Sequence, residues 1–236
     1  MSGSILCVDT RCDKVTRYCY AFRLNRIYQD TTLRKRWSFD HPPASQPDVD
    51  HELVHGSHAY ITCSGHGIDT EYQDHTGAPI MSTSHITRSG FKDKIVHLLA
   101  CEAGANLGQA LVSHGKANAF FGYNSYFEIP YLSTLPSTKD SDWEFSKTEP
   151  YNPLIDSDAE ICIQMDIEID IAILYKRDAE STFDAAENYV VSKLGAHPPI
   201  SAGVKRSLLH NFKSLVAPSV DFGGKSLWGD EAAQLA

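Results

Sequence analysis

The chain has 236 residues, of which 42% are hydrophobic and 22% are charged, and its formal net charge is −9. This length and composition are typical of one ordinary globular domain with a sizeable core. The negative charge argues against nucleic acid or an anionic membrane surface as the main partner, and no apolar run approaches the roughly 18 residues that span a bilayer.

The cysteine usage predicts a reduced, cytoplasmic protein. Six cysteines stand at positions 7, 12, 19, 63, 101 and 162, which is too sparse for a disulfide scaffold. Several lie inside apolar runs, where a free thiol packs as a small hydrophobic group. The first residues also lack the basic stretch followed by a long apolar run that marks a signal peptide.

Short apolar runs bounded by turn residues predict buried strands of an α/β sheet. The predicted strands of the first half are Ser4–Asp9, the aromatic-rich Arg17–Arg23, Tyr60–Cys63, Lys94–Ala100 and Ala117–Gly122. Asp40–Asp50 contains three prolines and reads as a loop, and Ile68–Ser82 as a long loop or small hairpin.

One helix is predicted between the last two of these strands. Ala105–Ser113 carries Leu107, Leu111 and Val112 at helical spacing, and Gly115 marks its end. A strand, a turn, a helix and a further strand in succession are typical of parallel crossover units.

The second half begins with a long polar segment. Tyr131–Pro153 is rich in Ser, Thr, Pro and Asp, and loops of this length are functional or disordered. Exposed loops of such composition are where proteolysis falls, so we expect residues 131–153 to be an activation or self-processing segment.

Ile161–Ile173 alternates apolar residues with Asp166, Glu168 and Asp170. This period of two favours a strand, but thirteen residues exceed the usual strand length, so a helix continuing toward Ser192 is the alternative. Thr182–Leu194 and Val204–Val216 are predicted helices. Together these elements predict a single α/β domain over residues 1–236, a three-layer α/β/α sandwich with a mostly parallel, about six-stranded sheet.

A histidine and a cysteine follow two of the predicted strands. His66 lies in the turn Ser64-Gly65-His66-Gly67, and Cys101 opens the turn Cys101-Glu102-Ala103-Gly104. Parallel sheets place active groups just past the carboxyl ends of their strands, so the two side chains should share one edge. A thiol within hydrogen-bond reach of an imidazole is an activated nucleophile, and a helix starting soon after Cys101 would favour its thiolate.

These two turns resemble the signatures of the caspase-like (clan CD) cysteine peptidases, which include caspases, metacaspases, legumains and gingipains. Ser-Gly-His-Gly is similar to the histidine motif of metacaspases. Ala-Cys-Glu-Ala-Gly differs by one residue from the Ala-Cys-Glu-Ser-Gly of legumains. The order, histidine before cysteine, also agrees, and the resemblance extends over Tyr60–Gly122.

The resemblance implies a caspase-like fold and a cysteine endopeptidase with protein or peptide substrates. His66 would protonate the leaving amine and orient the water for deacylation, and the backbone N–H groups of Gly67 and Cys101 would form an oxyanion hole. No metal and no organic cofactor is expected in this chemistry. A latent form, opened by processing or by an activating protein or ligand, is expected as well.

The resemblance also points to residues that would contact the substrate. In caspase-like folds the loop after the strand that follows the nucleophile helps to line the specificity pocket, which suggests Tyr123, Asn124 and Ser125. A surface turn with one buried aromatic side chain is the alternative for this loop. If Ile161–Ile173 is a strand, Asp166, Glu168 and Asp170 form an acidic row, which near the site would favour a basic residue before the scissile bond. A solvated outer face is the simpler explanation of that row.

Two other functions are open. A caspase-like domain that has lost activity would serve as a binding or regulatory module. His51-Glu52-Leu53-Val54-His55 matches the H-E-x-x-H motif of zinc peptidases, in which both histidines bind the metal from one helix face. Pro47 upstream and Gly56 directly after it leave about two helical turns for that motif.

Overall fold

A computed structural model describes residues 4–10, 14–23, 27, 36–38, 45–74, 76–86, 88–130, 157–175, 178–218 and 226–228. The strands are β1 (Ser4–Asp9), β2 (Arg36–Ser38), β3 (His58–Ser64), β4 (His66–Ile68), β5 (Glu71–Gln73), β6 (Pro79–Ser82), β7 (Ile95–Leu99), β8 (Ala119–Tyr123), β9 (Leu215–Pro218) and β10 (Ser226–Trp228). The helices are α1 (Lys14–Arg23), α2 (Gln46–His55), α3 (Arg88–Phe91), α4 (Leu107–Ser113), α5 (Ser157–Leu174), α6 (Ala179–Leu194) and α7 (Ala202–Ser214).

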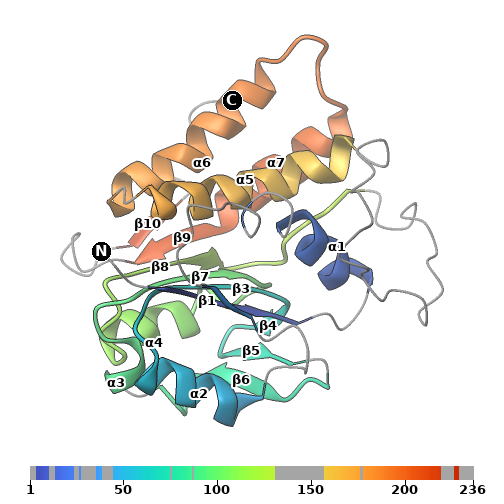
Figure 1. The fold of residues 1–236 in the computed structure, drawn as a ribbon. Coiled ribbons are helices and arrows are strands. Elements are labelled where there is room, and N and C mark those ends of the chain that lie inside the picture. The colour runs from blue at the N-terminus through green and yellow to red at the C-terminus, as the bar shows by residue number, and fades with distance from the viewer. Residues whose placement is uncertain are drawn as a thin grey trace.

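The predicted three-layer α/β/α sandwich is confirmed. Helices α1, α5, α6 and α7 cover one face of the main sheet, and α2, α3 and α4 lie on the other (Figure 1). Strands β4, β5 and β6 form a small antiparallel sheet of their own. The predicted processing segment, residues 131–153, lies outside the described residues. None of the described helices has the length and apolar character needed to cross a membrane.

The main sheet has the order β10-β9-β8-β7-β3-β1-β2 in the described part of the chain. Its central strands β2, β1, β3, β7 and β8 are parallel, whereas β9 runs antiparallel to β8. The strands predicted around Ser4–Asp9, Tyr60–Cys63, Lys94–Ala100 and Ala117–Gly122 are confirmed as β1, β3, β7 and β8. Parallel pairing brings the carboxyl ends of β1, β3 and β7 to one edge, as expected.

The prediction that Arg17–Arg23 is a strand was wrong, because these residues belong to helix α1. The alternation of Tyr18, Tyr20 and Phe22 suggested a strand. In the helix, however, Cys19, Phe22 and Arg23 are buried at a spacing of three and four residues, so they face the sheet together.

For Ile161–Ile173 the favoured strand was wrong and the alternative helix was right. Within Ile161–Ile173 the partly exposed positions are Ile161, Gln164, Glu168 and Ile171, which recur every three to four residues as on a helix face. The other faces are buried against the sheet layer, α6 and α7. The alternation of apolar and polar residues in the sequence therefore does not correspond to an alternation of buried and exposed positions in the structure.

The helix predicted over Val204–Val216 ends earlier, at Ser214. Leu215 turns the chain into β9, which pairs antiparallel with β8 through Val216 opposite Gly122 and Leu215 opposite Tyr123. All four residues of β9 are buried. Because a short apolar run is compatible with a buried helix end or a buried strand, the sequence pattern did not separate the two.

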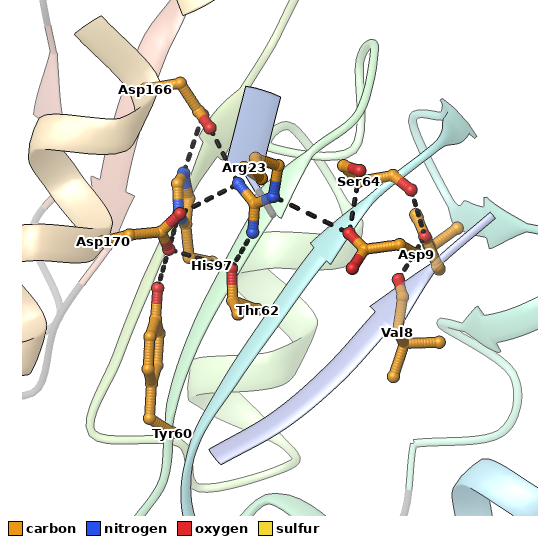
Figure 2. A network of polar contacts seen from close by, with 10 residues as sticks. Val8, Asp9, Arg23, Tyr60, Thr62, Ser64, His97, Asp166 and Asp170 are labelled. Carbon is orange, nitrogen blue, oxygen red and sulfur yellow. Dashed lines mark hydrogen bonds and ion pairs between the residues drawn. The ribbon is translucent and has the colours of Figure 1, made fainter. Parts of the chain in front are cut away.

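A buried network of charged and polar side chains joins α1 and α5 to the sheet (Figure 2). Arg23 Nη1 lies 3.0 Å from Asp166 Oδ2 and 2.9 Å from Asp170 Oδ2. His97 lies between the same carboxylates, with Nε2 2.8 Å from Asp166 and Nδ1 2.7 Å from Asp170. The remaining members come from three strands and bond to these groups through oxygen atoms: Asp9, Tyr60, Thr62 and Tyr123.

The side chains of Arg23, His97, Asp166 and Asp170 have no solvent-exposed surface, so each charge depends on its partners. Burial alone lowers the pKa of His97, but the carboxylates of Asp166 and Asp170 outweigh it and raise this pKa to about 9. Burial likewise raises the pKa of Asp170, and Arg23 and His97 outweigh it and hold the pKa well below its ordinary range. The network therefore keeps Arg23 and His97 protonated and Asp170 ionised at neutral pH.

We predict that His97 makes the fold less stable as the pH rises. An unfolded histidine loses its proton near pH 6.5, whereas folded His97 keeps it to about pH 9. The free energy of unfolding should fall between these values by at most about 1.4 kcal/mol per pH unit. His97→Gln should lack this decline and should be about 3–5 kcal/mol less stable below pH 6.5, where the wild-type cation is fully formed.

Urea unfolding across this pH range measures both effects. His114→Gln, at an exposed position directly after α4, is the matched control and should keep the wild-type slope. A His97→Gln variant with an unchanged slope would contradict the assignment of the charge to His97.

Candidate active site

The turn that carries His66 starts at the end of β3. Gly65 continues the ladder with β7 through a 3.1 Å hydrogen bond from its N–H to Leu99 O. A side chain at position 65 would collide with Thr10, since its Cβ would stand 2.0 Å from Thr10 Oγ1. Glycine is therefore required where the ends of β1 and β3 approach each other. His66 then opens β4 with an exposed side chain, paired across the strands with Gln73.

Tyr72 fastens the hairpin of β4 and β5 to the main sheet. Its ring is fully buried, and its hydroxyl lies 2.6 Å from Val8 O and 2.9 Å from Ser64 O. These two carbonyls belong to the carboxyl ends of β1 and β3. The hairpin that carries His66 is thus fixed to the carboxyl ends of β1 and β3.

The turn that carries Cys101 is tightly constrained. Glu102 has a φ of 57°, in the left-handed region that side chains other than glycine rarely adopt. The Ala103 N–H donates to Cys101 O at 2.7 Å, which closes the turn around Glu102. On its outer side the Glu102 N–H donates to Ser125 O at 3.0 Å and the Gly104 N–H to Tyr123 O at 2.7 Å. The loop after β8 therefore holds the turn in place.

The two turns lie in contact with each other. A Cβ built on Gly67 would stand 2.8 Å from Cys101 O and 3.0 Å from Ala100 Cβ. The hairpin is also tied to the start of α4, because Asp69 O accepts the N–H groups of Asn106 and Leu107 at 3.2 and 2.8 Å. The segments that carry His66 and Cys101 are thus brought together at the carboxyl edge of the sheet.

Cys101 differs from the other described cysteines in its exposure. It is partly exposed, whereas Cys7, Cys19, Cys63 and Cys162 are buried. Burial raises the pKa of the Cys101 thiol; the Phe127 N–H, 3.5 Å from Sγ, lowers it, and the Glu102 carboxylate raises it again. The net direction is upward, so in this structure the thiol is predominantly neutral at neutral pH.

The expected help from a helix N-terminus is not present. Helix α4 begins at Leu107, six positions beyond Cys101, and its first N–H groups are already bound by Asp69 O. The effect of a helix dipole falls off within the first turn. A backbone donor to the sulfur is instead the Phe127 N–H, on the loop after β8, which the sequence motif did not indicate.

The structure separates the predicted substrate contacts into two groups. Asn124 and Ser125 are partly exposed, and Ser125 touches the Cys101 turn through its carbonyl. Tyr123 is fully buried, and its hydroxyl donates to Asp166 at 2.9 Å. Its side chain is therefore turned into the buried network rather than toward a substrate.

The predicted acidic row is not formed. On helix α5, Asp166 and Asp170 lie one turn apart and are fully buried in the network, where Arg23 and His97 hold them. Glu168 lies on the partly exposed face of the helix and accepts a 2.8 Å hydrogen bond from Gln164. The prediction that Asp166 and Glu168 contact the substrate assumed that they share one face of a strand. On the helix they lie on different faces, so the prediction was wrong for both.

The H-E-x-x-H segment does form a helix. Asp40–Asp50 was predicted as a loop, but α2 starts at Gln46 behind the N-cap Ser45, with Pro47 in its first turn. The rings of His51 and His55 contact each other at a tilt, with centroids 4.7 Å apart, while a Glu52 carboxylate oxygen lies 3.0 Å from His58 Nε2. Among the described residues, the one group with three metal-ligating side chains close enough for an ion is His97, Asp166 and Asp170, and Arg23 binds both carboxylates there.

Comparison with known proteins bears on the fold. No model of a known protein family matches the chain, and no curated protein matches its sequence. Among solved structures, it is similar to the complex of the pro- and mature domains of RgpB from Porphyromonas gingivalis, with a TM-score of 0.50 and 10% identity. The match covers 87% of this chain and 45% of that chain, so this chain spans less than half of its length. The predicted caspase-like α/β fold is confirmed at this level.

We predict that Gly67→Ala separates the two turns and destabilises the fold by about 1–3 kcal/mol, because the new methyl group overlaps Cys101 O and Ala100. Gly195→Ala is the control: it has a negative φ, and its nearest neighbour would lie 3.6 Å away, so it should change stability by less than about 0.5 kcal/mol. Urea unfolding compares the two variants. Equal stabilities would show that the turns are not in the contact described.

Proposed function

We propose that this chain is a cysteine endopeptidase in which Cys101 is the nucleophile and His66 the general acid–base. The observation that carries the proposal is the contact of Gly67 with the backbone of Cys101 at the carboxyl edge of a caspase-like sheet. The exposed His66 and the one partly exposed described cysteine add to it. The resemblance of both turns to caspase-like peptidase motifs supplies the reaction class.

In the proposed reaction His66 takes the proton of the Cys101 thiol, and the sulfur attacks the carbonyl carbon of a peptide bond. The carbonyl oxygen takes up negative charge and is stabilised by the N–H groups of Gly67 and Cys101. His66 gives a proton to the leaving amine as the C–N bond breaks, which leaves an acyl-cysteine thioester. His66 then takes a proton from water as the water oxygen attacks the thioester carbonyl. The C–S bond breaks and His66 returns the proton to the sulfur, which releases the carboxylic acid and restores the thiol.

The neutral state of the thiol favours a latent form. A thiolate is the reactive nucleophile, and burial together with Glu102 disfavours it here. We therefore propose that processing in residues 131–153, or binding of an activating protein or ligand, raises the thiolate population. Recovery of only the full-length chain from an active preparation would contradict the processing route.

The raised pKa of the Cys101 thiol also fits the second candidate, a caspase-like binding or regulatory module without turnover. Such a module would keep the fold and the two turns but would have no use for a Cys101 thiolate. Reactivity of the thiol separates this candidate from the peptidase.

We predict that iodoacetamide modifies Cys101 before the buried Cys7 and Cys63, and that the rate rises with pH over about pH 5 to pH 9 as the thiolate forms. His66→Ala should slow the reaction near neutral pH by about tenfold, because it removes the imidazole proposed to stabilise the thiolate. Mass spectrometry of the alkylated peptides gives the rate at each cysteine. A Cys101 that reacts no faster than Cys7 would favour the binding module or a site closed until a partner opens it.

We predict that the chain, once processed or bound by its activator, cleaves members of a proteome-derived peptide library, and that Cys101→Ser and His66→Ala each lower the rate by at least about a hundredfold. His55→Ala and treatment with a metal chelator should leave the rate unchanged. New peptide termini, counted by mass spectrometry, are the readout. Loss of cleavage in His55→Ala or with the chelator would favour the zinc peptidase instead.

A further inference from the structure

The loop after β8 forms a strap across the candidate nucleophile. The strap, residues 124–129, continues directly from Tyr123 at the end of β8. Ser125 O holds the turn that follows Cys101, and two residues later the Phe127 N–H points at Cys101 Sγ, 3.5 Å away. A backbone N–H that faces sulfur favours the thiolate over the thiol. The position of the strap therefore bears directly on the reactivity of Cys101.

Helix α7 fixes the strap through one fully buried side chain. Asn211 has no exposed surface, and its amide group bonds to both backbone groups of Glu128. Asn211 Oδ1 accepts the Glu128 N–H at 2.7 Å, and Asn211 Nδ2 donates to Glu128 O at 2.8 Å. The first bond fixes the peptide unit that joins Phe127 to Glu128, and the second fixes the unit that follows Glu128.

Other contacts of α7 also reach the strap. His210 Nε2 donates to Tyr126 O at 2.9 Å, on the same peptide unit as the Phe127 N–H, but from a partly exposed position. Ser207 Oγ donates to the Glu128 side chain at 3.0 Å and leaves the Glu128 backbone untouched. Ser214 O accepts the Asn124 N–H at 2.8 Å, at the far end of the strap. Asn211 is thus the buried group that acts on the backbone beside Phe127.

We propose that Asn211 is a positioning residue for the Cys101 thiol: by fixing the backbone of Glu128, it holds the Phe127 N–H against Cys101 Sγ. Its meaning for catalysis rests on the proposed peptidase function. Its test does not, because alkylation of the thiol requires no substrate turnover. If the chain cleaves no peptide but Cys101 alkylation still depends on Asn211, the proposed peptidase function is contradicted and this inference stands.

The first experiment measures the rate of iodoacetamide alkylation of Cys101 against pH in Asn211→Ala. Without the two Asn211 bonds to the Glu128 backbone, the Phe127 N–H should move away from the sulfur. The Cys101 pKa should then rise by about one unit, with about tenfold slower alkylation near pH 7. Ser207→Ala is the matched control, because it removes a contact to the same Glu128 from the same helix but spares the backbone. It should leave the pH–rate curve unchanged.

The second experiment tests whether Asn211 acts through the Phe127 N–H. Phe127→Pro removes this N–H together with the ring, and Phe127→Ala removes only the ring, so their difference isolates the donor. Asn211→Asp, which keeps the shape of the side chain, is then measured alone and combined with Phe127→Pro. The added charge acts in both backgrounds and cancels in the double-mutant cycle.

The inference predicts a higher Cys101 pKa in Phe127→Pro than in Phe127→Ala. It also predicts that Asn211→Asp changes the Cys101 pKa much less in the Phe127→Pro background than in the wild-type background. The buried Cys7, Cys63 and Cys162 report on folding in the same samples, because their alkylation marks global opening. If Asn211→Ala opens the fold, the Asn211→Asp cycle decides alone. A folded Asn211→Ala with the wild-type curve, or an Asn211→Asp effect equal in both backgrounds, would overturn the inference.

Discussion

The pairing of Asp166 and Asp170 with Arg23 and His97 is the constraint on which the arrangement of layers depends. Two carboxylates on consecutive turns of α5 meet two cations, one from α1 and one from β7, and none of these side chains has solvent-exposed surface. A hydrophobic layer tolerates sliding of a helix along a sheet, whereas these bonds have defined directions and partners. They fix the register of α5 over β3 and β7, and the apolar residues around them supply most of the burial.

Sequence reasoning located the parallel strands because each is a short apolar run that ends in small residues. It also located both turns of the candidate site, since His66 and Cys101 follow two such runs. It did not locate Arg23 or His97, whose carboxylate partners on α5 are at least 143 and 69 positions away along the chain, respectively. A lone histidine in a strand gives no signal of its own. Only the folded chain shows that it is a buried cation.

The errors share one physical origin, which is that local alternation does not report burial on all sides. Helix α5 is covered by the sheet and by α6 and α7, so its isoleucines need not lie on one stripe. The thiol shows the same limit. Its surroundings are set by Phe127, on the loop after β8, and indirectly by Asn211 on α7, neither of which belongs to the motif around Cys101. A motif names the reacting groups, while distant segments set their electrostatics.

The late position of β9 in the chain has a consequence for synthesis. Gly104 packs against Val216, since a side chain at 104 would stand 2.4 Å from Val216 Cγ2, and Ser214 O holds one end of the loop that supports the Cys101 turn. Residues 101–104 leave the ribosome more than a hundred positions before these partners. The nucleophile turn of a nascent chain therefore lacks its final supports until α7 and β9 have emerged.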